Sequence, residues 1–196
     1  MSLQIAYQKP ASLRTLLFNP KKLEQKEGRC QTCGKCKSCG SRKGPGINMV
    51  KSCTHFSVKI DDKIKTFKIK SDLNCKNNGI YVAICTHPNC EQTYVGKTST
   101  NFSTRISGHR NKWLKADPSE GRDDTALLDH YRMHHSEIYQ NWSNTLSKAE
   151  LVGFDRAFQF VFVDKIGPNL TEQENFWKTQ LKSQLNRCNI ITPTIT

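Results

Sequence analysis

Two short triplets, each holding a tyrosine and a glycine, are the residues of this sequence best suited to chemistry. Gly79-Ile80-Tyr81 and Tyr94-Val95-Gly96 lie in segments 79–85 and 92–98, which are rich in Ile, Val and Tyr and are separated by a Thr-His-Pro-Asn cluster. This pattern predicts an antiparallel hairpin. Two tyrosines on paired strands can face one small site, although ordinary cross-strand aromatic packing explains the same pattern.

The segment after this hairpin adds a cation and an imidazole. Residues 101–113 carry apolar side chains at helical spacing, and Arg105 and His109 stand one helical turn apart beside that stripe. If the helix packs on the hairpin, both side chains flank the two tyrosines.

A carboxylate is expected from a helix over Leu170–Leu185. Glu174 falls on the apolar stripe of this helix, whereas Glu172 points to the opposite side. A buried, unpaired carboxylate costs roughly several kcal/mol unless it meets a cation or a metal. Alternatively, Thr171 and Glu174 form a capping box, while a cap made by Asn169 and Glu172 would leave Glu174 available for a site.

The cysteines predict zinc rather than disulfides. The chain has nine, an odd number, and four of them recur at intervals of three: Cys30, Cys33, Cys36 and Cys39. Ligands this close together usually supply half or three quarters of a zinc site, so Cys53 or Cys75 would complete it. An iron–sulfur cluster is the alternative. The intervening segment, 51–72, alternates like a basic hairpin that the metal holds in place.

A second zinc site is expected from Cys85 and Cys90 in the first hairpin and from His130 and His134 on a helix that begins at about Thr125. His135 is an alternative to His134. Without further support, three histidines on one helix are more often surface residues or hydrogen-bonded core residues than metal ligands.

The charge distribution favours a nucleic-acid partner. The chain has a net charge of +13, and residues 1–78 contain 17 Lys and Arg against 5 Asp and Glu, while residues 79–196 contain 13 against 12. This asymmetry predicts a phosphate-binding arm ahead of a nearly neutral core, with duplex DNA as the partner. The alternative is a solubilising basic tail.

Two further expectations concern segments without chemistry. No apolar run approaches the roughly 20 residues of a membrane span, and the start of the sequence lacks a signal peptide's apolar core, so we expect an intracellular protein without a membrane partner. Residues 116–125 read as a loop, and Tyr139–Val152 as an irregular connection with a short helix around Ser147–Leu151.

Taken in order, these motifs resemble the GIY-YIG nuclease superfamily. The sequence has both triplets, a helix with Arg105 and His109, a third strand at 157–166, and a helix with Glu174. The string Glu174-Asn175-Phe176-Trp177 resembles the endonuclease domain of Penelope-like retroelements, as do the cysteines between the triplets, the Arg105–Arg110 string and the upstream cysteine-rich linker. The resemblance spans roughly 12–189. Val95 departs from the residue that is usual in the middle of the second triplet. Near the end of the chain, Arg187-Cys188-Asn189-Ile190 stands where Gly-Leu-Asn is usual, so the asparagine of that pattern corresponds here to Asn189 or Asn186.

The resemblance implies an α+β fold with a small three-stranded antiparallel sheet flanked by helices, the GIY-YIG nuclease fold, and an N-terminal zinc-binding knuckle. It divides the chain into a basic segment at 1–28, a zinc-binding linker at 29–74 and a nuclease domain at 75–196. It also implies that Cys85, Cys90, His130 and one of His134 or His135 bind zinc together, giving about two zinc ions per chain.

The implied activity is that of a metal-dependent DNA endonuclease of the retroelement-integration type, in the nucleus. Glu174 would hold Mg²⁺ or Mn²⁺, and Tyr81 would act as the base. Tyr94 would position water or phosphate, and Arg105 would stabilise charge. The remaining roles fall to His109 as proton shuttle, Lys97 as phosphate contact and Asn189 as support for Glu174. RNA or a reverse transcriptase of the same element are further partners. The alternatives are an inactive zinc-dependent nucleic-acid-binding module and a structure-specific repair nuclease.

Overall fold

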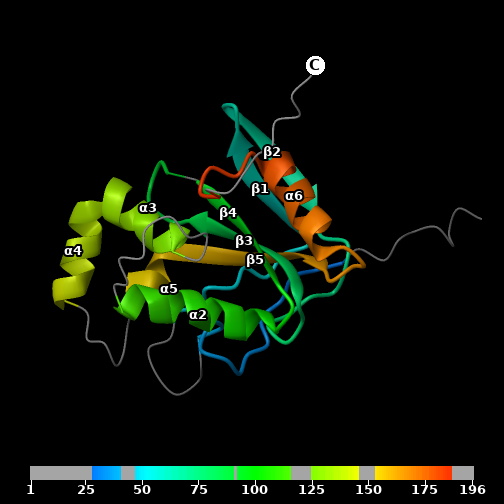
Figure 1. Ribbon diagram of the computed structural model, residues 1–196, viewed down its shortest axis with the longest axis horizontal. Helices are drawn as coiled ribbons and strands as arrows, with labels where there is room; N and C mark the ends of the chain where they lie inside the picture. The colour runs from blue at the N-terminus through cyan, green and yellow to red at the C-terminus, as the bar shows by residue number, and fades with distance from the viewer. Residues whose placement is uncertain (1–27, 41–46, 91, 116–124, 146–152, 187–196) are drawn as a thin grey trace, which may run out of the picture.

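A computed structural model describes residues 28–40, 47–90, 92–115, 125–145 and 153–186 of the chain. Within these ranges the protein is α+β, with small antiparallel sheets and helices, as the sequence predicts (Figure 1). None of the helices in these ranges has both the length and the apolar character needed to cross a membrane.

The central sheet has three antiparallel strands in the order β4-β3-β5. They are β3 (Gly79–Cys85), β4 (Thr93–Thr98) and β5 (Phe158–Lys165), so each predicted strand is confirmed to within one residue at its ends. β5 has the sequence FQFVFVDK and buries five of its first six residues, because both faces of the sheet are covered. At the start of β3, Gly79 has φ 136°, and a Cβ there would lie 2.2 Å from the Asp164 carbonyl oxygen. Only glycine fits this approach.

Helix α2 (Phe102–Lys115) follows β4 and covers one face of the sheet. The Asn101 side chain accepts a hydrogen bond from the Thr104 amide at 2.8 Å and caps the first turn of the helix. Phe102, Ile106, His109 and Trp113 form the buried stripe of α2. The predicted helix is therefore confirmed, and its His109 points inward.

Three short helices lie beside one another at one end of the sheet (Figure 1): α3 (Ala126–His134), α4 (Ser136–Thr145) and α5 (Gly153–Ala157). The expectation of an irregular connection from Tyr139 was wrong, because α4 continues to Thr145. Tyr139 meets Trp113 edge-on with ring centroids 5.2 Å apart, and Trp142 stacks on Tyr131 with centroids 5.7 Å apart. Tertiary aromatic contacts therefore stabilise a segment whose polar residues hide its helical period. The predicted short helix at Ser147–Leu151 lies outside the described residues.

Helix α6 (Leu170–Leu181) packs on β4 and β3. The predicted end at Leu185 was wrong, because Lys182 adopts a left-handed conformation with φ 45° and ends the helix. The chain then runs beside β4, where the Ser183 hydroxyl and the Leu185 amide both donate to the Thr93 carbonyl. Residues 183–186 thus cover an edge that would otherwise expose unpaired backbone groups.

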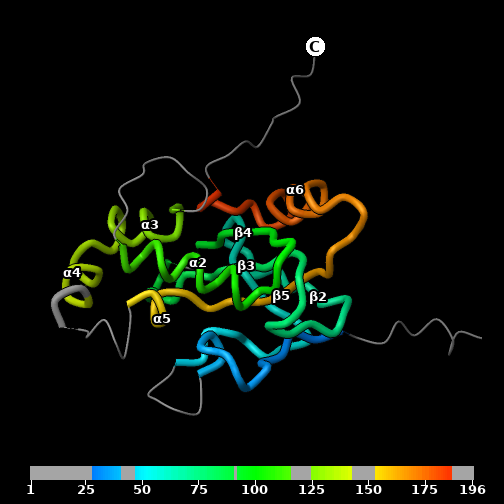
Figure 2. Tube along the Cα trace, turned by 60° about the horizontal axis from the view of Figure 1, so that its bottom comes forward, coloured from blue at the N-terminus to red at the C-terminus, as the bar shows by residue number. Residues whose placement is uncertain are grey.

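The cysteine-rich region forms the predicted hairpin, with β1 (His55–Ile60) paired to β2 (Lys63–Lys68). Phe56 and Phe67 pack on Trp177 of α6, with centroids 6.1 and 5.9 Å away. Val50 pairs in parallel with Phe160 of β5, and Figure 2 shows the blue and cyan N-terminal segments on the β5 side of the sheet. The region thus shares one hydrophobic core with the rest of the described chain. The division at residues 28 and 74 stays a prediction.

Candidate functional site

The two tyrosines lie on the same face of the sheet, beneath α2. Tyr81 pairs with Gly96 and Ala83 pairs with Tyr94 across the β3–β4 ladder, so the two phenols are diagonal neighbours with ring centroids 6.2 Å apart. His109 meets both rings, at 6.0 Å from Tyr81 and 5.8 Å from Tyr94. The structure therefore brings the predicted tyrosines and histidine together.

Tyr81 is the centre of a buried hydrogen-bond chain. Arg105 Nε donates to the Tyr81 hydroxyl at 3.2 Å, and that hydroxyl lies 2.7 Å from His109 Nε2. Because a guanidinium only donates, the phenolic hydrogen is left for His109 Nε2. Burial, with the positive charges of Arg105 and Lys112, lowers the pKa of His109 to about 3, so its imidazole is neutral and has one ring nitrogen able to accept a hydrogen bond.

The ionisation of Tyr81 is opposed by its surroundings. Burial raises the pKa of the Tyr81 phenol, and the nearby charge of Arg105 offsets that effect only in part. For Arg105, burial acts to lower the pKa, but the Tyr81 and Tyr94 phenols together raise it. Arg105 is therefore a permanent cation that contacts both phenols of the site.

Gly96 makes room for the Tyr81 ring. A Cβ at this position would lie 2.3 Å from both Cζ and the hydroxyl oxygen of Tyr81. The ring thus occupies the space that any other side chain at position 96 would need. This contact gives a physical reason why the second triplet ends in glycine.

A pocket of about 490 Å³ opens where β4, α2 and α6 meet. Four residues predicted for the site line it: Tyr94, Lys97, Arg105 and Glu174. Leu170 and the stretch Thr98-Ser99-Thr100 complete the lining. Tyr81 is fully buried behind this pocket and does not line it. A substrate in the pocket would therefore meet Tyr94, and Tyr81 would act through Arg105 and Tyr94.

Glu174 is free to face this pocket because the N-cap of α6 is Asn169, two residues before Thr171. The Asn169 side chain accepts a hydrogen bond from the Glu172 amide at 3.1 Å, so the cap made by Asn169 and Glu172 is confirmed. The Thr171 hydroxyl instead accepts from Lys97 Nζ at 2.9 Å. Glu174 is 8 % exposed, and its carboxylate is left to meet cations rather than the helix start.

Two lysines pair with the Glu174 carboxylate. Lys97 Nζ lies 3.1 Å from Oε2, and Lys178 Nζ lies 3.5 Å from Oε1. A divalent cation would find one carboxylate here, with the hydroxyls of Thr98, Ser99 and Thr100 in the same pocket. One carboxylate with waters and substrate oxygens is a usual Mg²⁺ environment. The donor set therefore fits Mg²⁺ or Mn²⁺, provided that an ammonium group gives way.

Of the two candidates for the asparagine near the end of the chain, Asn189 lies outside the described residues and Asn186 lies within them. The Asn186 side chain accepts from the Val95 amide at 2.8 Å and donates to the Val95 carbonyl at 2.7 Å. Asn186 thus pairs with the edge of β4 next to Tyr94, and its hydrogen bonds are to the Val95 backbone and the Ser183 hydroxyl rather than to Glu174.

One Cys/His cluster joins the β3–β4 turn to α3. Cys85, Cys90, His130 and His135 have their ligand atoms within 4.8 Å of one another and could hold a metal ion. The Nε2 atoms of His130 and His135 are 3.2 Å apart, Cys90 Sγ is 3.3 Å from His130 Nε2, and Cys85 Sγ is 3.7 Å from His135 Nε2. Tetrahedral zinc would separate two nitrogens by about 3.3 Å, and a sulfur from a nitrogen by about 3.6 Å. The cluster therefore suits zinc.

The structure selects His135 over His134 for this cluster. His135 caps the C-terminus of α3 with φ −135°, so its ring turns back toward His130, while His134 remains in the helix outside the set. Burial lowers the pKa of His130 to about 4, which keeps its imidazole in the neutral, metal-binding form. His87, which the sequence analysis did not single out, stacks on His135 with ring centroids 3.9 Å apart.

The second cluster consists of Cys33, Cys36, Cys39 and Cys75 and could also hold a metal ion, suited to zinc. Cys39 Sγ lies 3.9 Å from Cys33 Sγ and 3.0 Å from Cys75 Sγ. Cys75 therefore completes the set, and Cys30 and Cys53 stand outside it. The Cys30 sulfur accepts from the Phe162 amide at 3.3 Å, and its backbone pairs with Cys53. Because Cys30, Cys33, Cys36 and Cys39 are evenly spaced, the sequence does not indicate that Cys30 lies outside the cluster.

This four-cysteine cluster is connected to the pocket by backbone hydrogen bonds. The Cys75 and Asn77 carbonyls accept from the Ser103 and Phe102 amides in the first turn of α2. The Asn78 side chain donates to the Ser99 carbonyl at 3.1 Å. The segment that completes the cluster thus also supports the helix that carries Arg105.

The sequence analysis did not identify Lys178 or the pocket residues Thr98, Ser99, Thr100 and Leu170 as part of the site. Lys178 stands four residues after Glu174, a spacing that predicts an ion pair on one helix face and could have revealed it. Thr100 joins the pocket through a loop, for which the sequence carries no periodic signal. Arg110, part of the string that resembles the family, instead forms a bidentate ion pair with Asp155 between α2 and α5.

Comparison of this chain with protein-family models, with curated proteins and with solved structures finds no match. The case for a function therefore rests on the side chains themselves.

Proposed function

We propose that this protein is a metal-dependent DNA endonuclease of the GIY-YIG type, closest to the nuclease domain of Penelope-like retroelements, and that it cuts target DNA for integration. The observation that carries the proposal is the pocket in which Tyr94 and Lys97 of β4, Arg105 of α2 and Glu174 of α6 meet. A phenol, two cations and a carboxylate around one opening are the groups that phosphodiester hydrolysis requires.

In the reaction, a water oxygen attacks phosphorus while the bond from phosphorus to the 3′ oxygen of the preceding nucleotide breaks. The cations of Arg105 and Lys97 neutralise the non-bridging phosphate oxygens. We assign Tyr94 to orient the attacking water, because it lines the pocket whereas Tyr81 does not. The attacking water loses its proton to solvent, and solvent protonates the departing 3′ oxygen. Tyr81 is then a positioning residue that fixes the Arg105 guanidinium, and His109 fixes Tyr81.

Glu174 is the residue that would hold Mg²⁺ or Mn²⁺, whose charge would stabilise the phosphate and the departing oxygen. The two zinc ions are structural in this proposal. The Cys85 cluster ties the β3–β4 turn to α3, and the Cys33 cluster supports the start of α2.

The partner we propose is duplex DNA bound through the basic N-terminal third. Residues 28–40 and 47–78 hold several exposed lysines, including Lys35, Lys37 and Lys76 beside the four-cysteine cluster. RNA or a reverse transcriptase of the same element would be further partners, and the nucleus the site of action.

The test is a cleavage assay on supercoiled plasmid and on branched DNA, with and without Mg²⁺. The parent protein should nick DNA only with the metal, and Glu174→Gln should abolish nicking while leaving DNA affinity nearly unchanged. Glu172→Gln is the matched control, because this glutamate lies exposed on the same helix. Cleavage by Glu174→Gln near the parent rate would remove Glu174 from the site.

An inactive, zinc-dependent nucleic-acid-binding module is the second candidate. It is favoured by the pairing of both Glu174 oxygens with Lys97 and Lys178, which satisfies the carboxylate without a metal. DNA binding without cleavage under every metal condition would establish this function. Preference for branched over plasmid DNA would instead indicate a repair-type nuclease of the same superfamily.

A further inference from the structure

Glu174 is held by two lysines that differ in their freedom to move. Lys178 lies on the same helix, four residues further on, and its side chain is 12 % exposed. Lys97 reaches across from β4, and its side chain is 37 % exposed. The ammonium of Lys178 is thus enclosed with the carboxylate, whereas that of Lys97 stands at the open side of the pocket.

The contacts of Lys97 describe a single resting position. Its Nζ lies 3.1 Å from Glu174 Oε2 and donates to the Thr171 hydroxyl at 2.9 Å, so α6 supplies both partners. Lys97 itself lines the pocket together with Arg105 and Tyr94. Rotation of its long, flexible stem would carry the ammonium into the pocket without moving the backbone.

An ammonium and a divalent cation compete for the same oxygen. Lys97 neutralises Oε2 while the pocket is without a substrate, and it repels a second cation at close range. A metal that takes Oε2 must therefore displace Lys97. The displaced ammonium remains at the pocket, where a phosphate oxygen is its natural partner.

We propose that Lys97 is a displaceable substitute for the catalytic metal: it holds Glu174 Oε2 in the free protein, yields it to a divalent cation and then turns to the substrate phosphate. Lys178 keeps Oε1 throughout and fixes the orientation of the carboxylate. This inference rests on the proposed function, and it adds that metal binding and phosphate binding are coupled through one side chain.

The test measures Mn²⁺ binding to the zinc-loaded full chain without DNA, by the electron paramagnetic resonance signal of free Mn²⁺. Lys97→Met should bind Mn²⁺ about tenfold or more tightly than the parent, because the competing charge is gone. Lys97→Arg keeps that charge and should bind Mn²⁺ no more tightly than the parent. Thr171→Val removes only the neutral partner of Lys97, so it should tighten binding by a smaller factor.

Two further variants separate the possible failures. Lys63→Met removes an exposed lysine from the β1–β2 hairpin and controls for net charge. Glu174→Gln should abolish the tight site in every background; if Mn²⁺ affinity is unchanged by it, the proposed function fails as well. If Glu174→Gln abolishes binding but Lys97→Met leaves the affinity at the parent value or weakens it, the displacement of Lys97 is refuted while the metal site stands.

Discussion

The Tyr81 hydroxyl and His109 Nε2 lie 2.7 Å apart in the core, although 28 residues separate them in the sequence. This hydrogen bond joins β3 to α2 at the point where Arg105 also contacts the phenol. It therefore ties the position of a pocket cation to the packing of the helix on the sheet.

The two tyrosines should respond differently to removal of the hydroxyl group. Tyr81→Phe leaves the His109 nitrogen and an Arg105 donor without their partner in a buried place, so we expect a loss of about 1–3 kcal/mol in unfolding free energy. Tyr94→Phe should lose less stability than Tyr81→Phe, because Tyr94 lines the pocket and water there can reach the Arg105 group that loses its partner, yet it should cleave on the order of a hundredfold more slowly. Denaturant unfolding and single-turnover cleavage measure the two effects. Full cleavage by Tyr94→Phe would return the central role to Tyr81.

His109 should make the fold sensitive to acid. Its pKa falls from an ordinary value of about 6.5 in the unfolded chain to about 3 in the fold, so the unfolded state binds the extra proton first and stability drops as the pH falls below 6.5. Between pH 7 and pH 5 this one group should account for about 2 kcal/mol of lost stability.

The comparison of the parent with His109→Gln isolates that contribution, because glutamine does not titrate and other groups cancel in the difference. Unfolding free energies should converge between the two proteins as the pH falls from 7 to 5. A constant difference across this range would show that His109 is not buried as a neutral imidazole.

Gly96→Ala should displace the Tyr81 ring. The added Cβ would lie 2.3 Å from Tyr81 Cζ, inside van der Waals contact, so we expect a loss of about 1–3 kcal/mol. The matched control is Gly108→Ala, since Gly108 lies inside α2 with open space around a Cβ, and it should stabilise the protein by up to about 1 kcal/mol. Thermal unfolding of the two variants checks the prediction, and equal shifts would contradict it.

The zinc content of cysteine variants should distinguish the cysteines that bind zinc from those that do not. Purified protein should carry about two zinc ions, and Cys75→Ser and Cys90→Ser should each remove one, because each belongs to a different cluster. Cys30→Ser and Cys53→Ser should retain both ions. Elemental analysis decides the matter; iron in place of zinc, or loss of zinc from Cys30→Ser, would refute this assignment.

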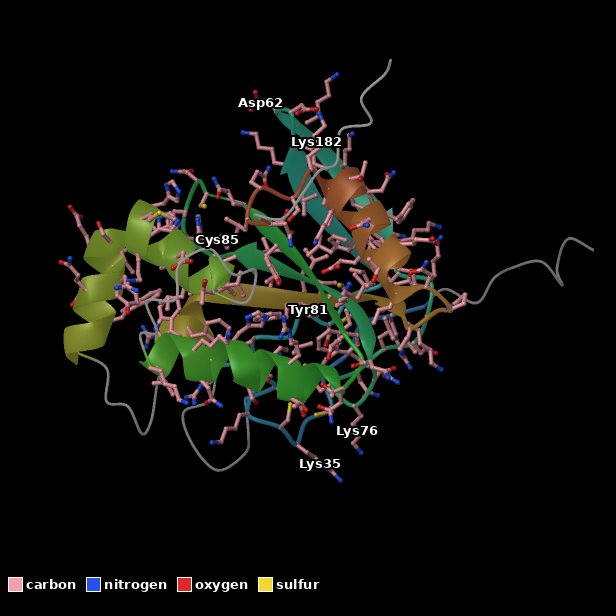
Figure 3. All side chains as sticks on the ribbon, in the orientation of Figure 1. Lys35, Asp62, Lys76, Tyr81, Cys85 and Lys182 are labelled. Carbon is pink, nitrogen blue, oxygen red and sulfur yellow. The ribbon has the colours of Figure 1, made fainter. Side chains whose placement is uncertain are left out.

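The basic surface at the four-cysteine cluster should bind phosphate. Lys35 and Lys76 lie next to cluster cysteines and extend outward below α2 in Figure 3. Changing both to Gln should weaken duplex binding and flatten the slope of log K against log salt by about 0.9 for each lost phosphate contact. Lys115→Gln with Arg132→Gln, two exposed basic residues on α2 and α3, is the control of equal charge. Equal slopes for the two double variants would contradict a DNA-binding surface localised at the four-cysteine cluster.

Much of the architecture follows from local patterns. β3, β4, β5, α2 and the β1–β2 hairpin lie where alternation and helical periodicity predict them, because each pattern records which face of one element is buried. Glu174 is likewise visible in sequence, since a carboxylate on an apolar stripe must meet a cation. The Asn169 cap that frees it is a short-range signal of the same kind.

Tertiary structure alone decided which residues act together. Cys75 rather than Cys30 joins the four-cysteine cluster, and His135 rather than His134 joins the Cys/His cluster. Ligand sets depend on where distant segments of the chain meet. Tyr81 and Tyr94 are equivalent in sequence and both are buried, yet only Tyr94 lines the pocket, whereas Tyr81 lies behind it. The pairing of Lys97 with Glu174 spans two elements that no periodicity connects. Distances of this kind arise from packing, and spacing along the chain does not encode them.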